Sequence, residues 1–394
     1  MLTTKALRSL IYKYFGDNTS KDLVKIRAPG RINLIGEHID YNDGPVMPLA
    51  ISLHTVVRLM PREDTLVYVY STRQEEELIF DLKDIKLGDG PKWGNYIKGV
   101  SKLLFNGVNK PRGFNCIISG NLPLSSGLSS SAALEISFAL GAARINNLII
   151  SPLEMIKLCQ KAEIEYANIQ CGLMDQVASM LGKSGHIIYF DTLDGSISQI
   201  PFPKDYFIAA IASGQTRDLA TSEYNQRRQE CRDVICIAQE RLGVSSFRYL
   251  DGFKLNTLSP YLSNKQFMRA WHVLEEIQRT KQAAEALRKG NMAELGELIN
   301  QSHQSLDSLF EVSTSHINYQ VSLIQHLPYV LGARLCGGGF GGYIIALVKA
   351  SEINKFQNSI LDLADKKVVP GDMFITTPQD GAIKYIYIRK QPYS

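Results

Sequence analysis

The densest group of side chains that could do chemistry lies in residues 30–44, GRINLIGEHIDYNDG. An apolar, strand-like piece runs directly into a cluster of arginine, glutamate, histidine, aspartate and asparagine, with glycines at both ends. A rigid element that delivers hydrogen-bonding groups in this way suits a small polar ligand. A sugar is the obvious candidate, because its hydroxyls need both donors and acceptors. Since Gly, Asn and Asp are also ordinary turn formers, a plain polar turn between two strands explains the residue types equally well.

A second segment, residues 120–135 (GNLPLSSGLSSSAALE), follows a predicted strand and opens a predicted helix. Gly127 lets the backbone approach a ligand closely. The serines offer hydroxyl and N–H groups where the helix dipole is positive, which favours phosphate binding. The alternative is a serine-rich N-cap before a helix of alanine and leucine.

Three further side chains are ambiguous when taken singly. Asp175 lies between apolar residues, where the sequence alone favours a helix N-cap. Glu163 would be an ordinary glutamate on a helix surface. Tyr224 could stack on a sugar, but alone it is better explained as a helix residue beside a solvated pair of arginines.

Two glycine motifs resemble nucleotide-binding motifs but lack a feature that those motifs need. Residues 337–342 (GGGFGG) have the spacing G-x-G-x-x-G, but they precede an apolar strand, whereas a dinucleotide fingerprint must open a helix. We expect these glycines to allow close approach of the backbone to a ligand or to another loop. Gly182-Lys183-Ser184 is not a Walker A loop, because Val177 stands where that loop needs a glycine.

The elements that must position these side chains mix strands and helices without regular βαβ alternation, which favours α+β over a doubly wound sheet. The chain of 394 residues predicts two domains, which we place at 1–200 and 201–394. A strand-like pattern runs from 24 to about 80, for example at 24–28, 46–53 and 66–70, and further strand patterns lie at 113–119, 186–190, 207–212, 343–348 and near 382–389. The helix patterns lie at 1–20, 93–104, 130–146, 154–166, 172–181, 222–242, within 264–330 and near 351–365, and a Gly-rich loop begins at 333.

Composition narrows the class of protein. A hydrophobic content of 45%, a charged content of 21% and a net charge of +4 fit a soluble globular protein. No dense run of lysine and arginine predicts nucleic-acid or membrane-surface binding, and no apolar run reaches the length of a membrane span. The six cysteines form no C-x-x-C pair, so neither a zinc site nor a disulfide framework is predicted, and a reducing compartment fits them. We expect a cytoplasmic monomer without a secretory signal.

Taken together and in this order, the segments resemble the galactokinase branch of the small-molecule kinase superfamily that also holds homoserine, mevalonate and phosphomevalonate kinases. Residues 29–48 resemble the galactokinase signature, 123–133 the phosphate loop and 332–342 the third motif. The resemblance covers nearly the whole chain. It implies two lobes of α+β type with the active site in the cleft between them. It also implies ATP-dependent phosphorylation of the anomeric hydroxyl of D-galactose to α-D-galactose 1-phosphate.

The resemblance also assigns roles to individual residues. It implies Asp175 as the catalytic aspartate, with Arg31 beside it. Sugar contacts are implied for Glu37, His38, Asp40, Gly172 and Tyr224. ATP contacts are implied for Trp93, near the adenine, and for Ser125, Ser126, Gly127, Leu128, Ser129, Ser130 and Ser131. Mg²⁺ is the implied cofactor, with Ser131 and Glu163 as ligands, although Ser129 and Ser130 stay open as alternatives to Ser131.

These assignments make chemical sense. Asp175 can accept the proton of the attacking hydroxyl, and Arg31 can keep Asp175 ionised because a nearby cation favours the carboxylate. Mg²⁺ prefers oxygen ligands and keeps several waters, so one serine and one glutamate suffice. Whether Asp175 is a true base or an electrostatic and positioning group stays open.

The chain departs from the family pattern at Ile39, Pro45, Asn168, Cys336 and residues 213–216. Several of these positions are expected close to the sugar or the nucleotide, so the identity of the sugar stays open. The first alternative is a kinase for another hexose such as N-acetylgalactosamine. The second is a catalytically silent galactose sensor that binds a transcriptional partner, against which the intact residues 130–133 (SSAA) and Asp175 argue.

Overall fold

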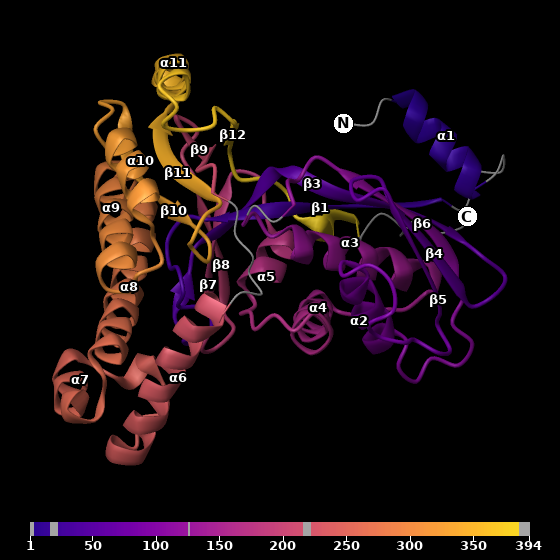
Figure 1. Ribbon diagram of the computed structural model, residues 1–394, viewed down its shortest axis with the longest axis horizontal. Coiled ribbons are helices and arrows are strands. Elements are labelled where there is room, and N and C mark those ends of the chain that lie inside the picture. Colours follow the sequence, from indigo (N-terminus) through magenta and orange to yellow (C-terminus); the bar gives the residue numbers. More distant parts are fainter. Residues whose placement is uncertain (1–3, 16–22, 125–126, 216–221, 386–394) are drawn as a thin grey trace.

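The computed structural model describes residues 4–15, 23–124, 127–215 and 222–385 (Figure 1). The strands are β1 (Val24–Asn33), β2 (Pro45–Val46), β3 (Pro48–Pro61), β4 (Leu66–Ser71), β5 (Glu76–Asp81), β6 (Phe114–Gly120), β7 (His186–Asp191), β8 (Ile197–Pro201), β9 (Tyr206–Ala212), β10 (Val330–Cys336), β11 (Tyr343–Lys349) and β12 (Met373–Thr376). The α-helices are α1 (Thr4–Phe15), α2 (Gly94–Leu104), α3 (Ser130–Ile145), α4 (Pro152–Tyr166), α5 (Met174–Leu181), α6 (Ser222–Leu242), α7 (Gly252–Leu258), α8 (Asn264–Arg288), α9 (Met292–Ser308), α10 (Ser315–Gln325) and α11 (Ile353–Asp365). Short 3₁₀ helices are η1 (Phe247–Tyr249), η2 (Ser259–Tyr261), η3 (Ala350–Glu352) and η4 (Ala382–Tyr385).

The first part of the chain builds a five-stranded sheet in the order β1-β3-β6-β4-β5. Its strand pairs are antiparallel except for β4 and β6, which are parallel. Helices α2, α3, α4 and α5 lie along one face, and α1 lies on the opposite side (Figure 1). Helix α3 packs on β1 and β3, and it is apolar on nearly every side because it is buried almost completely. The N-terminus of this buried helix is therefore held rigidly at the end of the sheet.

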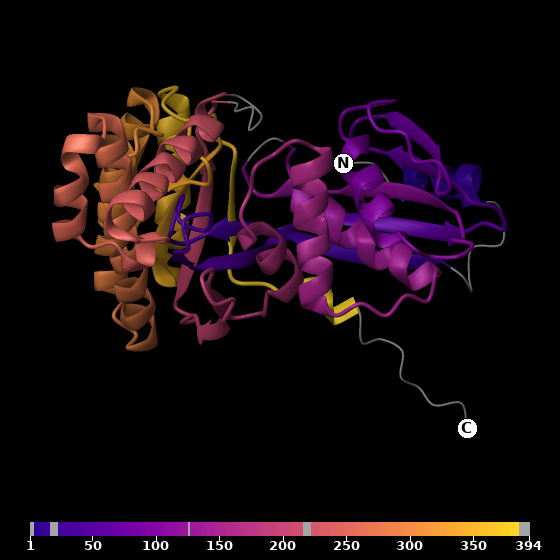
Figure 2. The same cartoon turned by 90° about the horizontal axis from the view of Figure 1, so that it is seen from below.

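The later part of the chain builds a four-stranded antiparallel sheet in the order β10-β11-β9-β12. Helices α9 and α10 pack on β10, and α8 packs on α9. A third sheet has the strand order β2-β7-β8, and its strand β2 belongs to the end of the signature segment, residues 29–48. Helix α8 packs against β2 and β8. Figure 2 shows the two parts side by side, with β1 and β3 running from one into the other. The signature loop between β1 and β2 is therefore delivered to the helices of the second part.

Most predicted elements are confirmed, and so is the α+β class. The prediction missed β10, whose sequence VLGARLC was divided between the helical region and the Gly-rich loop. Gly332 and Arg334 interrupt its apolar pattern for reasons of packing. A Cβ at Gly332 would lie 2.2 Å from the Gly296 carbonyl oxygen on α9, and the fully buried Arg334 donates mainly to Asn33, Leu34 and Glu37 of the first part of the chain.

Two other predictions at the C-terminal end are corrected. The short strand β12, which pairs with β9 over only four residues, was not predicted. The strand predicted near 382–389 is wrong over residues 382–385, which form η4, and the remainder lies outside the described residues. The rejection of a dinucleotide site at 337–342 is confirmed, because this loop connects β10 to the antiparallel β11 and opens no helix.

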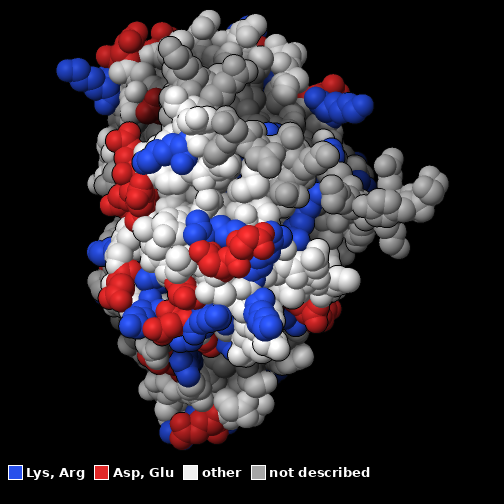
Figure 3. Space-filling view, turned by 90° about the vertical axis from the view of Figure 1, so that its right-hand side faces the viewer, with Lys and Arg blue, Asp and Glu red and all other residues white. Residues whose placement is uncertain are grey.

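Charged side chains of both signs are interspersed among the coloured residues of the face shown in Figure 3. Within the described part of the chain, no helix has the length and apolar content needed to cross a bilayer. All six cysteines are free thiols.

Candidate active site

One cavity collects most of the residues singled out by the sequence. It encloses about 750 Å³, part of which is open to solvent. Its walls are formed by Arg31, Glu37, His38, Asp40, Tyr41, Gly127, Ser129, Ser130, Ser131, Glu163, Ile169, Cys171, Gly172, Met174, Asp175, Tyr224, Gly337 and Gly338. Leu128 is buried behind the wall, and its carbonyl accepts the Arg31 N–H at 3.0 Å. Ser125 and Ser126 lie outside the described residues.

An arginine–aspartate pair forms the base of the cavity. Arg31, on β1, donates from Nε to Asp175 Oδ1 at 2.7 Å and from Nη2 to Asp175 Oδ2 at 3.0 Å. Its Nη1 donates to the Gly127 carbonyl at 2.6 Å. Burial alone would lower the pKa of Arg31, but the adjacent Asp175 carboxylate, together with Cys336 and Glu37, more than offsets it, so the pKa is raised. The N-cap interpretation of Asp175 is wrong, because Leu173 is the N-cap of α5 and Asp175 faces Arg31.

The start of α3 turns a serine toward this pair. Ser129 occupies the N-cap position with a left-handed φ of 60°, and its side chain makes no capping hydrogen bond. Its hydroxyl instead donates to Asp175 Oδ2. The interpretation of this segment as a plain serine cap is therefore wrong. Ser130 and Ser131 begin the helix at the cavity wall, where the first N–H groups have no partner within the helix and the helix dipole suits an anion.

Glu163, on α4, is buried against the phosphate-loop side of the cavity, so its interpretation as a surface glutamate is wrong. Its Oε2 accepts from Gln176 Nε2 at 2.7 Å and from Cys171 Sγ at 3.5 Å, and the Ser131 hydroxyl also bonds to its carboxylate. Burial, with the nearby Asp175 charge, raises the pKa of Glu163 to about 7.

This carboxylate environment fits a hard divalent cation. Behind Glu163, Glu135 is fully buried and accepts from the same Gln176 Nε2 at 3.3 Å. Among the described residues, no group of three or more His, Cys, Asp or Glu side chains is arranged as a metal site. A cation beside Ser131 and Glu163 would therefore complete its shell with water and ligand oxygens, as Mg²⁺ does.

The signature residues line the opposite wall. The segment is a turn between β1 and β2, as the plain-turn alternative has it, but the turn is buried: Glu37 is 2% exposed and His38 is 4% exposed. His38 has a φ of 63°, and its Nδ1 lies 2.7 Å from the Tyr41 hydroxyl. The centroid of its ring lies 4.7 Å from that of Phe310 and 5.5 Å from that of Tyr224. An aromatic cluster thus fixes the polar edge of this wall.

Asp40 and Gly172 meet at close range. A Cβ on Gly172 would lie 2.0 Å from Asp40 Oδ2, so only glycine leaves room for this carboxyl group. Burial, with the Asp175 and Glu37 charges, raises the pKa of Asp40 to about 7. The nearby Arg31 and Arg228 charges act in the opposite direction but do not outweigh this effect, so the cavity holds a buried carboxyl group that can accept hydrogen bonds from ligand hydroxyls.

Trp93 lies in a second cavity of about 450 Å³, whose wall is mostly apolar. Leu122, Leu124 and Leu134 also line it, and Ser130 borders both cavities. The Trp93 Nε1 donates to Glu76 Oε2 at 2.7 Å. A flat apolar group in this cavity would lie next to the N-terminus of α3.

The atypical positions do not form the walls of either cavity. Ile39 is fully buried in the hydrophobic core and Pro45 belongs to β2. Asn168 takes a left-handed φ of 58°, and Cys336 is buried beside Glu37 and Arg334. These four side chains do not line the walls, although Asn168 and Cys336 directly precede the wall residues Ile169 and Gly337, so their closeness to the sugar or the nucleotide stays a prediction.

Sequence reasoning missed the residues that hold the wall from behind. Arg334 could have been found, since an arginine in an apolar strand next to a glycine motif is unusual. His272 and Glu276 on α8 carried no signal, because they look like ordinary residues of a charged helix.

Comparisons with known proteins agree with this geometry. Residues 12–61 match the family model described as the galactokinase galactose-binding signature. Residues 95–183 match the GHMP kinases N terminal domain, and residues 283–364 match the GHMP kinases C terminal model. A galactokinase of Chloroflexus aurantiacus is 36% identical over 363 residues, which cover 92% of each chain. The chain belongs to the galactokinase family.

Further relatives give the same result. A galactokinase of Glaesserella parasuis is 38% identical over 360 residues, 90% of this chain and 93% of the relative. The solved structure of Lactococcus lactis galactokinase complexed with galactose is 34% identical, with a TM-score of 0.89 over 96% of this chain and 98% of that chain. Methanococcus jannaschii mevalonate kinase, at 18% identity and a TM-score of 0.65, shares the fold. The predicted galactokinase family, two-lobed kinase fold and kinase activity are confirmed.

Proposed function

We propose that this chain transfers the γ-phosphoryl group of ATP to the anomeric hydroxyl of D-galactose, giving α-D-galactose 1-phosphate and ADP. One observation carries the proposal. The Arg31–Asp175 pair stands where the polar wall of Glu37, His38 and Asp40 meets the N-terminus of α3. A sugar held by that wall and a phosphate held by that helix would meet at Asp175. The relatives named as galactokinases support the choice of sugar.

The chemistry follows from this placement. The sugar hydroxyl oxygen attacks the γ-phosphorus, the bond to the β-phosphate oxygen breaks, and ADP carries away that oxygen. Asp175 accepts the proton that the attacking hydroxyl releases. Arg31 orients the Asp175 carboxylate through two hydrogen bonds and adds positive charge beside the transferring group. The proposed sugar contacts are Glu37, His38, Asp40, Gly172 and Tyr224.

The nucleotide would occupy the adjoining space. We propose that the adenine enters the apolar cavity at Trp93 and that the phosphates lie along residues 127–131. Ser131 and Glu163 would hold Mg²⁺, which neutralises phosphate charge when it is bound. The domain boundary near residue 200, a monomeric state and a cytoplasmic location stay predictions, and light scattering on the purified protein would test the monomer.

A coupled assay of ADP release tests the function. The acceptors are galactose, N-acetylgalactosamine, glucose, galacturonate, homoserine and mevalonate, each with and without ATP. We expect the highest kcat/KM with galactose. A higher kcat/KM with N-acetylgalactosamine would transfer the assignment to that hexose. Galactose binding without any ADP release would indicate a silent sensor instead.

A further inference from the structure

The side chain of Glu276, in the middle of α8, faces the backbone of the signature loop rather than solvent. It is completely buried. Its Oε1 accepts from the Gly36 N–H at 3.0 Å, from the Glu37 N–H at 3.3 Å and from the Ser302 hydroxyl at 2.7 Å. Its Oε2 accepts from Arg279 Nη1 at 2.6 Å. A single carboxylate thus joins α8, α9 and the loop that carries the candidate sugar contacts.

The loop needs such an acceptor. Gly36 has a φ of +101° and His38 a φ of 63°, so this turn follows no regular ladder that could take its amide groups. Buried N–H groups without a partner are costly, and only a carboxylate offers enough lone pairs for several donors at once. An ion pair with Arg279 alone would need only one oxygen. The second oxygen is committed to the loop and to α9.

Glu37 is held at three further points. The His272 Nε2 lies 3.3 Å from the Glu37 carbonyl oxygen, and His272 Nδ1 lies 2.8 Å from the Ser305 hydroxyl. Burial lowers the pKa of His272 to about 4, so the ring is neutral and donates to the carbonyl from one nitrogen. The Glu37 carboxylate accepts from Arg334 Nη1 at 2.9 Å and from the Gly337 N–H at 2.8 Å.

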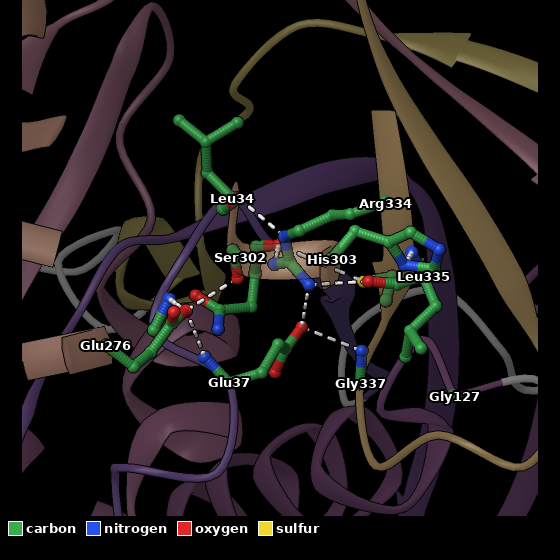
Figure 4. A network of polar contacts seen from close by, with 12 residues as sticks. Leu34, Glu37, Gly127, Glu276, Ser302, His303, Arg334, Leu335 and Gly337 are labelled. Carbon is green, nitrogen blue, oxygen red and sulfur yellow. Dashed lines mark hydrogen bonds and ion pairs between the residues drawn. The ribbon is translucent and has the colours of Figure 1, made fainter. Parts of the chain in front are cut away.

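Figure 4 shows Glu37 between Glu276 and Ser302 on its backbone side and Arg334 and Gly337 at its carboxylate. Each anchor comes from the second part of the chain, whereas Glu37 follows β1 of the first part. Apart from Gly337, these anchoring residues do not line the cavity, so the position of its wall is set largely from behind.

We propose that Glu276 is a positioning residue for the sugar: by holding the Gly36 and Glu37 amides it places the Glu37 and His38 side chains in the cavity wall. The proposal rests on the proposed function, because it takes that wall as the sugar site. The positioning role that we propose concerns sugar binding and not nucleotide binding. The nucleotide cavity is built from β3, β4, β6 and α3, none of which Glu276 contacts by a hydrogen bond.

Two variants separate positioning from charge. Glu276→Asp keeps the charge but withdraws the carboxylate by about one bond length, and a displacement of about 1 Å in a positioned group can cost up to about 10²-fold. Glu276→Gln keeps the length but replaces one acceptor with a donor. The matched control is Glu275→Gln, which changes the neighbouring carboxylate. That side chain is 44% exposed and contacts Arg279 at 3.4 Å.

The experiment measures kcat, the KM for galactose, the KM for ATP and the melting temperature of each variant. We expect both Glu276 variants to raise the KM for galactose about tenfold or more while the KM for ATP changes less than about twofold, and Glu275→Gln to match the wild type. The shift in melting temperature caused by galactose should shrink in the Glu276 variants.

Three results would overturn the proposal: an unchanged KM for galactose, parallel rises in both KM values, or loss of folded protein in both Glu276 variants, which would mean a structural role alone. The measurement on the wild type distinguishes a failure of the proposed function from a failure of the positioning role. If the wild type does not phosphorylate galactose, the proposed function fails. If it does and the variants behave as the wild type, only the positioning role fails.

Discussion

Replacing Asp175 with asparagine changes the side chain on which the proposed chemistry depends while nearly preserving its shape. In the present structure both Asp175 oxygens accept from Arg31, at 2.7 and 3.0 Å, and Oδ2 also accepts from Ser129. The asparagine amide nitrogen cannot accept, so one Arg31 donor or the serine hydroxyl loses its partner. A lost hydrogen bond to a charged group costs about 1.5–3 kcal/mol. We therefore expect the free energy of unfolding to fall by about 2 kcal/mol.

The catalytic effect should be larger than the effect on stability. A lost acid–base group costs about 10²–10⁴ in rate, which corresponds to roughly 3–5 kcal/mol in the activation free energy. We expect Asp175→Asn to lower kcat at least about 100-fold in the coupled ADP assay. Urea unfolding of the same protein shows whether it is folded under assay conditions, and calorimetry with galactose shows whether the sugar still binds.

Asp64→Asn is a matched control. Asp64 receives the same two-pronged contact, from Arg62 Nε at 2.7 Å and Nη2 at 2.6 Å, but it lies on the surface. We expect its turnover to equal that of the wild type. If folded Asp175→Asn retains kcat within about threefold of the wild type, Asp175 is neither the base nor an essential charge, and the reasoning is refuted.

Other perturbations test the remaining parts of the site. Since the pKa of Asp40 is raised to about 7, its carboxylate becomes protonated as the pH falls from 8 to 6. We therefore expect the KM for galactose to rise about tenfold over this range. A KM that does not change with pH would contradict this role. Trp93→Ala should raise the KM for ATP about tenfold and leave the KM for galactose unchanged, because base stacking on an aromatic ring contributes about 1–3 kcal/mol. Equal effects on both KM values would argue against an adenine site. Glu163→Gln should raise the Mg²⁺ concentration for half-maximal activity at least about tenfold, and an unchanged titration would remove Glu163 from the ligands.

Local sequence patterns predicted the elements whose formation depends on neighbouring residues in the chain. Apolar alternation located β1, β3 and β4, and the Ser-rich opening of α3 was placed within a residue. Motif order then assigned Arg31 and Asp175 together, and the structure joins them although they lie 144 residues apart in the chain. No spacing rule links two such positions, so only the resemblance to a family connected them.

What the sequence could not predict depends on long-range packing. Glu276 and His272 look like residues of a solvated helix until α8 is placed against the signature loop. The strand β10 was missed because Gly332 and Arg334 break the alternation of apolar residues. Both residues are explained by contacts with distant parts of the chain, Gly332 by the close approach of α9 and Arg334 by its hydrogen bond to Leu34. Ile39 lies between His38 and Asp40, yet it faces the core, because a left-handed residue precedes it and turns the chain.

Identification of the product tests the central claim most directly. The wild-type protein is incubated with galactose, ATP and Mg²⁺, and the product is analysed by phosphorus and proton NMR. We predict one phosphate ester, in which phosphorus couples to the anomeric proton of the α form, and an equal amount of ADP. A phosphate on another hydroxyl of galactose, or ADP release that does not depend on galactose, would contradict the placement of the anomeric hydroxyl beside Asp175.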